Sequence, residues 1–281
     1  MFSIALRVSL AACLLAASPA ADAPPPPTIS AARPEADGWL VHAVQSEFQA
    51  GTTEIHVLLP SRLDAQAKYP VLYILPVEAG DGRQWGQPRQ EVQRLGLPDK
   101  YGCICVYPTF SHLPWYADHP DDPRIRQESY FVRVVVPFVE RTYPAQGKPE
   151  GRLLVGFSKS GWGAFSLLLR HPQLFGRAAA WDAPLAMERP DRFGMGEIFG
   201  TQENFAPYQI TRLLRERAVA VRRGQRLIHL GYDNFRDQHA VAEKVLNEAR
   251  IEHVFHDGPQ RRHAWGSGWL PEAVELLSRG R

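Results

Sequence analysis

The stretch that decides the fold reads Gly151-Arg-Leu-Leu-Val-Gly-Phe-Ser-Lys-Ser-Gly-Trp-Gly-Ala164. An apolar run of strand length passes through Gly156-x-Ser158-x-Ser160 directly into a helical pattern. Small residues at Gly156 and Ser160 permit a sharp strand-to-helix turn, which lifts the Ser158 hydroxyl into a cleft above a sheet. About one Gly-x-Ser tripeptide is expected by chance in a chain of this composition, so the tripeptide alone also fits a glycine-rich turn with a capping serine. The strand and helix around it favour the first interpretation.

Around this unit, apolar runs of strand length alternate with longer helical patterns. We predict strands at Leu40–Phe48, Glu54–Leu59, Val71–Leu75, Cys103–Tyr107, Leu153–Phe157, Ala178–Trp181, Leu227–Leu230 and His253–His256. We predict helices at Gln90–Leu95, Tyr130–Tyr143, Ser160–Arg170, Tyr208–Arg217, Gln238–Ala249 and Pro271–Ser278. Two early strands followed by strand-helix alternation predict one α/β domain with a largely parallel sheet, an antiparallel N-terminal edge and helices on both faces.

The N-terminal residues are typical of an export signal. A short n-region with one positive charge, Met1–Arg7, precedes an apolar stretch and the small-x-small site Ser18-Pro-Ala20. We therefore predict a signal peptide at 1–20 and a secreted or periplasmic protein. Cys13 lies in a lipoprotein-like context, but the apolar run continues beyond it, so we expect no lipid anchor there. The Pro/Ala-rich residues 21–37 predict a disordered leader, and 38–281 the folded domain.

Composition and residue spacing exclude several kinds of partner. The 281 residues include 32 Lys+Arg and 30 Asp+Glu without a basic run, which argues against nucleic-acid binding. We expect no membrane association once the signal is removed. Cys103 and Cys105 stand two apart on one strand, a poor geometry for a disulfide, and are predicted to be buried free thiols. His253 and His256 point to opposite faces of a strand, so we expect no metal site from them and no cofactor.

A serine nucleophile needs a histidine base oriented by a carboxylate, and suitable residues follow Ser158. Asp233 lies in a turn directly after the strand that begins at Leu227. His263 lies in a loop after the last predicted strand. Because a parallel sheet places its ligand site at the carboxyl ends of its strands, we expect these two side chains to lie near Ser158.

Several segments together resemble the esterase D-like α/β hydrolases. That group includes S-formylglutathione hydrolases, feruloyl and acetylxylan esterases, enterochelin esterases and the antigen 85 mycolyltransferases. The segments are Tyr69-Pro-Val-Leu-Tyr-Ile-Leu75, Gly156-Phe-Ser-Lys-Ser-Gly-Trp-Gly163, Arg170-His-Pro-Gln-Leu-Phe-Gly176, Gly231-Tyr-Asp-Asn-Phe235 and His263-Ala-Trp265. The resemblance implies an α/β-hydrolase fold without a cofactor. It implies Ser158 as nucleophile, His263 as general base and acid, and Asp233 as the carboxylate that orients the imidazole.

The chain departs from these relatives around the elbow and the oxyanion loop. Ser160 occupies the fifth elbow position, where most relatives carry Gly, and Lys159 stands where Met is common. The His-Gly that follows the third strand in the family is replaced by Pro76-Val77. We expect the oxyanion hole to use the backbone N–H of Lys159 together with that of Val77 or Glu78, a choice that the sequence leaves open.

The triad acid is a second point of difference. Relatives often carry it three residues after the glycine, where this chain has Asn234. We choose Asp233, since Asn-Phe follows it as in relatives, with Asp237 on the next helix as the alternative.

Aromatic residues near these segments are candidates for the walls of a substrate cleft. The loop Phe110–His119 resembles the family loop that carries a Trp-Tyr pair beside the active serine, here Trp115 and Tyr116. Trp85 follows the oxyanion loop, and Trp265 stands beside the predicted base. These rings either bind substrate or pack the loops.

The sequence thus predicts an exported serine carboxylesterase that acts through an acyl-enzyme on Ser158. Its substrate would be a small-molecule or polysaccharide-linked ester. Two alternatives stay open. One is an acyltransferase on the same triad, in which a sugar hydroxyl replaces water. The other is a degenerate esterase-like fold that binds carbohydrate. The natural ester and the oligomeric state are not predicted.

Overall fold

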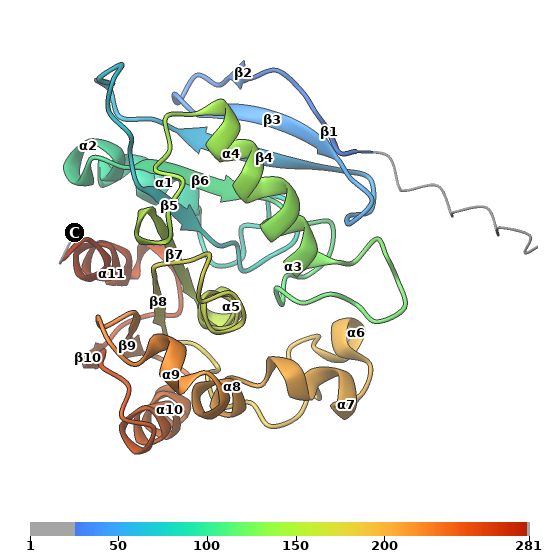
Figure 1. Cartoon of the computed structure of the whole chain (residues 1–281), viewed down its shortest axis with the longest axis vertical. Helices are drawn as coiled ribbons and strands as arrows, with labels where there is room; N and C mark the ends of the chain where they lie inside the picture. The colour runs from blue at the N-terminus through green and yellow to red at the C-terminus, as the bar shows by residue number, and fades with distance from the viewer. Residues whose placement is uncertain (1–25, 280–281) are drawn as a thin grey trace, which may run out of the picture.

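A ten-stranded mixed sheet forms the centre of the computed structural model, which describes residues 26–279 (Figure 1). The strands are β1 (Thr28–Ile29), β2 (Arg33–Pro34), β3 (Leu40–Gln45), β4 (Thr52–Leu58), β5 (Val71–Ile74), β6 (Ile104–Pro108), β7 (Arg152–Phe157), β8 (Arg177–Trp181), β9 (Leu227–Tyr232) and β10 (His253–Gln260). Their order is β1-β3-β4-β6-β5-β7-β8-β9-β10, with β2 beside β3. Strands β5 to β10 run parallel, and β1 to β4 add antiparallel pairs at one edge. The predicted α/β class is confirmed.

Helices cover both faces of this sheet. They are α1 (Pro88–Arg94), α2 (Leu97–Tyr101), α3 (Gln127–Tyr130), α4 (Val136–Thr142), α5 (Ser158–Arg170), α6 (Gly196–Phe199), α7 (Gln202–Phe205), α8 (Ile210–Glu216), α9 (Ala218–Val221), α10 (Arg236–Glu248) and α11 (Trp269–Ser278). The sequence predicted the longer ones, but α2, α6, α7 and α9 were missed. With four or five residues each, these contain too few turns to show a helical period.

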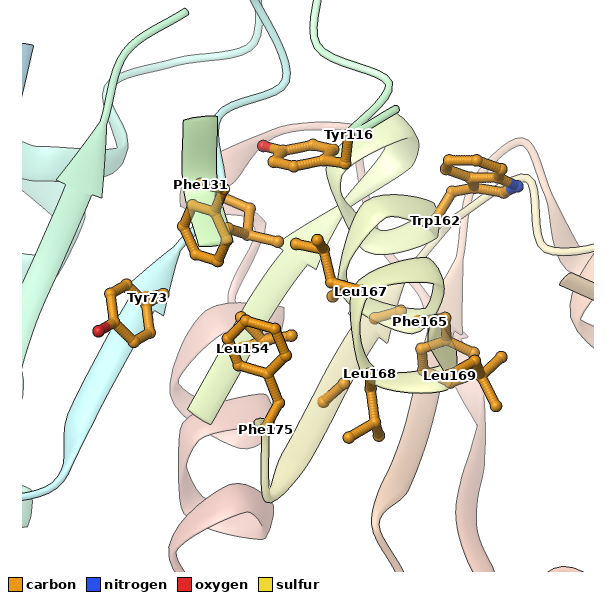
Figure 2. Close-up of a cluster of buried hydrophobic side chains, with 14 of the residues drawn as sticks. Tyr73, Tyr116, Phe131, Leu154, Trp162, Phe165, Leu167, Leu168, Leu169 and Phe175 are labelled. Carbon is orange, nitrogen blue, oxygen red and sulfur yellow. The ribbon is translucent and has the colours of Figure 1, made fainter. Parts of the chain in front are cut away.

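Successive side chains of the central strands point alternately into two hydrophobic cores, one on each face of the sheet. In β5, Tyr73 joins the core beneath α3, α4, α5, α8 and α10, while Leu72 and Ile74 join the core beneath α1, α2 and α11. Figure 2 shows part of the first core, where Tyr73 and Leu154 come from the sheet and Leu167 from α5. Strand side chains point to opposite faces in turn, so a strand buried on both faces is apolar throughout. This explains the continuous apolar runs of the sequence.

The helix predicted over Tyr130–Tyr143 is present but not uniform. A π-helical stretch, Phe131–Val135, connects α3 to α4. Pro137 lies in the first turn of α4, and its ring nitrogen cannot donate the hydrogen bond that a regular helix would need there. A widened turn before the proline accommodates this missing donor.

Part of the expected disordered leader belongs to the sheet, so that prediction is wrong for residues 26–37. Thr28 and Ile29 pair with the end of β3, and Arg33 and Pro34 pair with its start. The outer edge of β3 carries backbone groups that would otherwise lack partners, and two short strands, one with a proline, satisfy them. The predicted signal peptide 1–20, with Cys13, and residues 21–25 lie outside the described residues.

Two further observations concern the described part of the chain. Cys103 and Cys105 are buried free thiols with their Sγ atoms 4.0 Å apart, as predicted. Among residues 26–279, no helix has the length and apolar character needed to cross a bilayer.

A buried ion-pair cluster anchors the C-terminal end of α5. Glu128 of α3 accepts hydrogen bonds from Arg170 Nε at 2.9 Å and from His171 Nε2 at 2.6 Å. Burial acts to raise the pKa of Glu128, but these two partners outweigh it and leave the pKa below its ordinary value. The cluster fixes the helix whose first residue is Ser158.

Candidate active site

Ser158 lies on a sharp turn between β7 and α5. Its φ angle is 52°, a left-handed conformation that a residue with a side chain rarely adopts. Gly156 is required here, because a Cβ atom at that position would lie 2.5 Å from the backbone carbonyl of Ser160. The Ser160 hydroxyl accepts a hydrogen bond from Phe157 N and donates one to Phe157 O. The turn thus has the geometry of a nucleophile elbow, with serine serving at its fifth position.

A cavity of about 420 Å³ opens above this turn. It is lined by Trp85, Ser158, Lys159, Pro184, Arg192, Phe193, Asn234, Phe235, Gln238 and His263. Ser158 follows β7 and Asn234 follows β9, so the cavity lies at the carboxyl ends of the parallel strands. The structure therefore brings the predicted nucleophile and the predicted base, which are far apart in sequence, into one cavity.

The His263 imidazole is held by Asp182. His263 Nδ1 lies 2.5 Å from Asp182 Oδ2, and the other carboxylate oxygen accepts backbone N–H bonds from Asn234 and Phe235, each at 2.9 Å. Burial acts to raise the pKa of Asp182, but hydrogen bonds from His263 and backbone N–H groups leave the pKa below its ordinary value. An ionised Asp182 accepts the Nδ1 proton, so His263 directs the lone pair of Nε2 away from the carboxylate.

The prediction that Asp233 orients the imidazole is wrong. Asp233 Oδ2 accepts a hydrogen bond from the backbone N of His263 at 3.0 Å, and its Oδ1 accepts one from Gln260 Nε2 at 3.0 Å. Asp233 therefore fixes the loop that carries the histidine, not its ring. The alternative, Asp237, is exposed in the first turn of α10.

Asp182 could have been found by the reasoning that selected Asp233. It directly follows β8, whose apolar run the sequence shows, and it precedes His263 in the chain. Both aspartates lie at carboxyl ends of parallel strands. What distinguishes them is the direction of the side chain, which no local pattern encodes.

The predicted oxyanion donors lie on two segments, the first turn of α5 and the loop after β5. Lys159 stands in the first turn of α5, whose N–H groups have no carbonyl partner within the helix, and it lines the cavity. Val77 and Glu78 follow β5, and neither lines the cavity. Glu78 Oε1 instead accepts a hydrogen bond from Gln84 N. Burial lowers the pKa of the Lys159 ammonium, and the charge of Glu78 opposes that shift.

Only one of the four predicted substrate-binding aromatics lines the cavity. Trp85 does so, and its ring meets that of His263 edge to face at 4.8 Å. Trp115, Tyr116 and Trp265 are buried, which contradicts their prediction as cleft walls.

These three rings contact segments that adjoin the cavity. The Tyr116 hydroxyl donates to Pro76 O at 2.6 Å, and its ring occupies the space that a side chain at Gly163 would need (Figure 2). Trp115 Nε1 donates to Phe193 O at 3.2 Å. Trp265 packs edge to face on Phe157. These aromatic residues, distant from the serine in sequence, thus hold the oxyanion loop and the elbow in place.

Metal-binding groups are not gathered at this cavity, since His263 is its single histidine and no carboxylate lines it. Within residues 26–279, one cluster has the residue types to hold a metal ion: His229, Glu243 and His253. None of the three lines the cavity.

Comparison with known proteins identifies the family of this chain. The family model described as "Putative esterase" matches residues 46–208, more than half of the chain. The chain belongs to this esterase family. The predicted resemblance to the esterase D-like hydrolases is confirmed.

Individual relatives are distant. Esterase Rv1288 and Esterase MT1326, from two strains of Mycobacterium tuberculosis, are 26% identical to this chain over 142 residues. The match covers 48% of this chain and 30% of each relative, so it spans less than a third of their length. A solved ferulic acid esterase superposes with a TM-score of 0.67 at 20% identity, over 86% of this chain and 98% of that one. An S-formylglutathione hydrolase from Staphylococcus aureus superposes with a TM-score of 0.69 at 13% identity, over 86% and 98%. At these identities the solved structures show a shared fold.

Proposed function

We propose that the protein is an exported serine ester hydrolase with Ser158 as nucleophile, His263 as general base and acid, and Asp182 as the orienting carboxylate. The observation that carries the proposal is the bond from His263 Nδ1 to Asp182 Oδ2, beside a cavity that His263 and Ser158 both line. A nucleophile on a left-handed turn, a base and a carboxylate that fixes its tautomer are the parts that serine acyl transfer requires.

The reaction follows from the proton positions. His263 Nε2 accepts the Ser158 proton as Oγ attacks the ester carbonyl carbon, and Asp182 stabilises the imidazolium that forms. Backbone N–H groups stabilise the resulting oxyanion, from Lys159 on one side and from Val77 or Glu78 on the other. The imidazolium then gives its proton to the leaving alcohol. In deacylation His263 activates a water molecule, and the acid is released.

The volume and the lining residues of the cavity indicate what kind of ester it would accept. Its volume of about 420 Å³ lies within the range of small-molecule sites. Trp85, Phe193 and Phe235 supply apolar surface, and Lys159 and Arg192 supply positive charge. We propose that a small acyl group, or the ester end of a larger polysaccharide-linked substrate, enters here.

The test is hydrolysis of short-chain and hydroxycinnamoyl chromogenic esters by the purified chain, with covalent labelling by a fluorophosphonate. Ser158→Ala and His263→Ala should each lower kcat by about 10³-fold or more, and Ser158→Ala should also abolish labelling. Ser61→Ala is the matched control, since Ser61 is exposed and hydrogen-bonds with Asp99. It should keep full activity. A folded wild type that neither hydrolyses esters nor takes the label would contradict the proposal and favour a carbohydrate-binding role.

Export rests on residues 1–20 of the sequence. We expect the mature chain to begin after Ala20 and to appear in the periplasm or the medium. N-terminal sequencing of the protein from fractionated cells tests this. A cytoplasmic chain that keeps Met1 would contradict it.

A further inference from the structure

We propose that His229, Glu243 and His253 form a binding site for a divalent metal ion of the zinc class. The three residues come from β9, α10 and β10, which pack together at the C-terminal edge of the sheet (Figure 1). Their potential ligand atoms all lie within 4.8 Å of one another. Two imidazoles and one carboxylate form a ligand set that suits Zn²⁺.

The distances from Glu243 to the two imidazoles fit an ion with little rearrangement. Glu243 Oε2 lies 3.1 Å from His229 Nε2 and 2.6 Å from His253 Nε2. Zn–N and Zn–O bonds of about 2.0–2.1 Å place tetrahedral ligand atoms about 3.3 Å apart. Each imidazole would have to move away from the carboxylate by less than about 1 Å to admit the ion. The ligand atoms of the two imidazoles lie within 4.8 Å of each other, so these would have to approach one another by up to about 1.5 Å.

The groups behind His253 and Glu243 hold these two ligands in a metal-binding orientation. His253 Nδ1 lies 2.7 Å from Ile251 O, and a carbonyl can only accept, so Nδ1 carries the proton. Nε2 is thereby directed at Glu243, and either a proton or a metal ion must lie between these two acceptors. Asn247 Nδ2 donates to Glu243 Oε1 at 2.8 Å, which leaves Oε2 for the centre of the cluster. Such outer hydrogen bonds are typical of histidine and carboxylate ligands to metals.

The two histidine side chains are buried, and the partly exposed Glu243 leaves a route by which an ion can enter. The His229 side chain is fully buried, and Phe255 stacks on its ring at 4.3 Å. The His253 side chain is 9% exposed and that of Glu243 is 27% exposed. A metal ion can therefore enter beside Glu243 and complete its coordination with water from the same side.

The site lies apart from the cavity but is connected to the segment that carries Asp182. Ala183 N donates a hydrogen bond to His239 Nε2 at 2.9 Å, so the proton of His239 is on Nδ1, which lies 3.4 Å from His229 Nδ1. An ion on His229 Nε2 requires the proton of His229 to be on Nδ1, which breaks this long contact. Ala183 directly follows Asp182. An ion that tied β10 to β9 and α10 would stabilise the part of the fold that leads to the His263 loop.

The sequence analysis did not predict this cluster. The sequence predicted that His253 and His256 point to opposite faces of their strand. In the structure His256 pairs with Glu272, whereas His253 pairs with Glu243. The sequence does not show that His253 meets residues of a neighbouring strand and helix. His256 therefore serves as the matched control, a histidine on the same strand with one carboxylate partner.

The experiment uses the untagged mature protein, freed of metal by chelation and exchanged into buffer. Zn²⁺ at about 100 times its dissociation constant should raise Tm by roughly 5 °C or more. Co²⁺ should give the visible absorption of a four- or five-coordinate site at one ion per chain. His253→Gln and Glu243→Gln should lose both effects, whereas His256→Gln should keep both. Circular dichroism and Tm in chelator establish that each variant folds.

An unchanged Tm with Zn²⁺ and no Co²⁺ absorption in the wild type would overturn the proposal. Equal responses in folded His253→Gln and in the wild type would also overturn it, because the ion would then bind elsewhere. The readout is independent of esterase activity, so failure of the proposed triad would leave this test intact.

Discussion

Replacing Asp182 by Asn tests which aspartate serves His263. Asp182 Oδ1 accepts two backbone N–H bonds, so an Asn side chain at this position would keep its carbonyl oxygen there. Its NH₂ group would then face His263 Nδ1 as a donor. The imidazole would have to accept at Nδ1 and carry its proton on Nε2, where it cannot receive the Ser158 proton.

The expected loss is large and lies in kcat. A reversed tautomer in a serine triad lowers kcat by about 10⁴-fold, or about 5 kcal/mol of transition-state stabilisation. Asp233→Asn is the matched control, because it removes the same charge from a second aspartate that hydrogen-bonds to His263. One Asn oxygen can still accept from His263 N, so at most one hydrogen bond is lost, and we expect less than about a tenfold effect.

The assay is steady-state hydrolysis of a chromogenic ester, with Tm measured for both variants. We expect both variants to fold fully and only Asp182→Asn to lose about 10⁴-fold in kcat. A large loss in Asp233→Asn with near-normal Asp182→Asn would refute the reasoning and restore the assignment made from the sequence.

Three further predictions follow from the same structure. Gly156→Ala places a Cβ against the Ser160 carbonyl and should destabilise the fold by about 1–3 kcal/mol and displace the nucleophile; an unchanged urea midpoint and kcat would contradict this. Trp85→Ala removes the ring that packs on His263 and should lower kcat/KM for aromatic esters by up to about tenfold, and equal rates for variant and wild type would argue against a role for the ring. Glu128→Gln should lower the free energy of unfolding by about 1–3 kcal/mol at neutral pH. The pKa of Glu128 is lowered in the folded state, so this difference is complete above its ordinary pKa of 4.5 and disappears as the pH falls through the lowered value; denaturant unfolding that shows the same gap in strong acid would contradict the assignment.

Much of the fold was accessible from local pattern. Apolar runs located every strand from β3 to β10, and the spacing of small residues located the turn at Ser158. These features depend on neighbours within a few residues, because strand burial and turn sterics are local. Strands β1 and β2 were missed because their residues look like a polar, proline-rich leader. Their order comes from pairing with β3, a partner that composition does not reveal.

The aromatic loop shows the same limit. Trp115 and Tyr116 stand in a loop that follows a strand, where exposed binding residues are common. The tertiary structure instead turns both rings inward, and Tyr116 fills the space above Gly163. Burial is a property of what packs against a loop, and the residues that cover these rings lie elsewhere in the chain.

Local sequence patterns were enough to predict the α/β architecture, the esterase resemblance, and the nucleophile and histidine of the candidate site. The carboxylate that meets the imidazole could be identified only from the folded chain. Asp182 and His263 are 81 residues apart, while Asp233 is 30 residues from His263 and contacts only its backbone. Both acids end parallel strands, and sequence order favours neither. The choice depends on the direction in which each side chain leaves its strand, and that is fixed when β8, β9 and the His263 loop pack together.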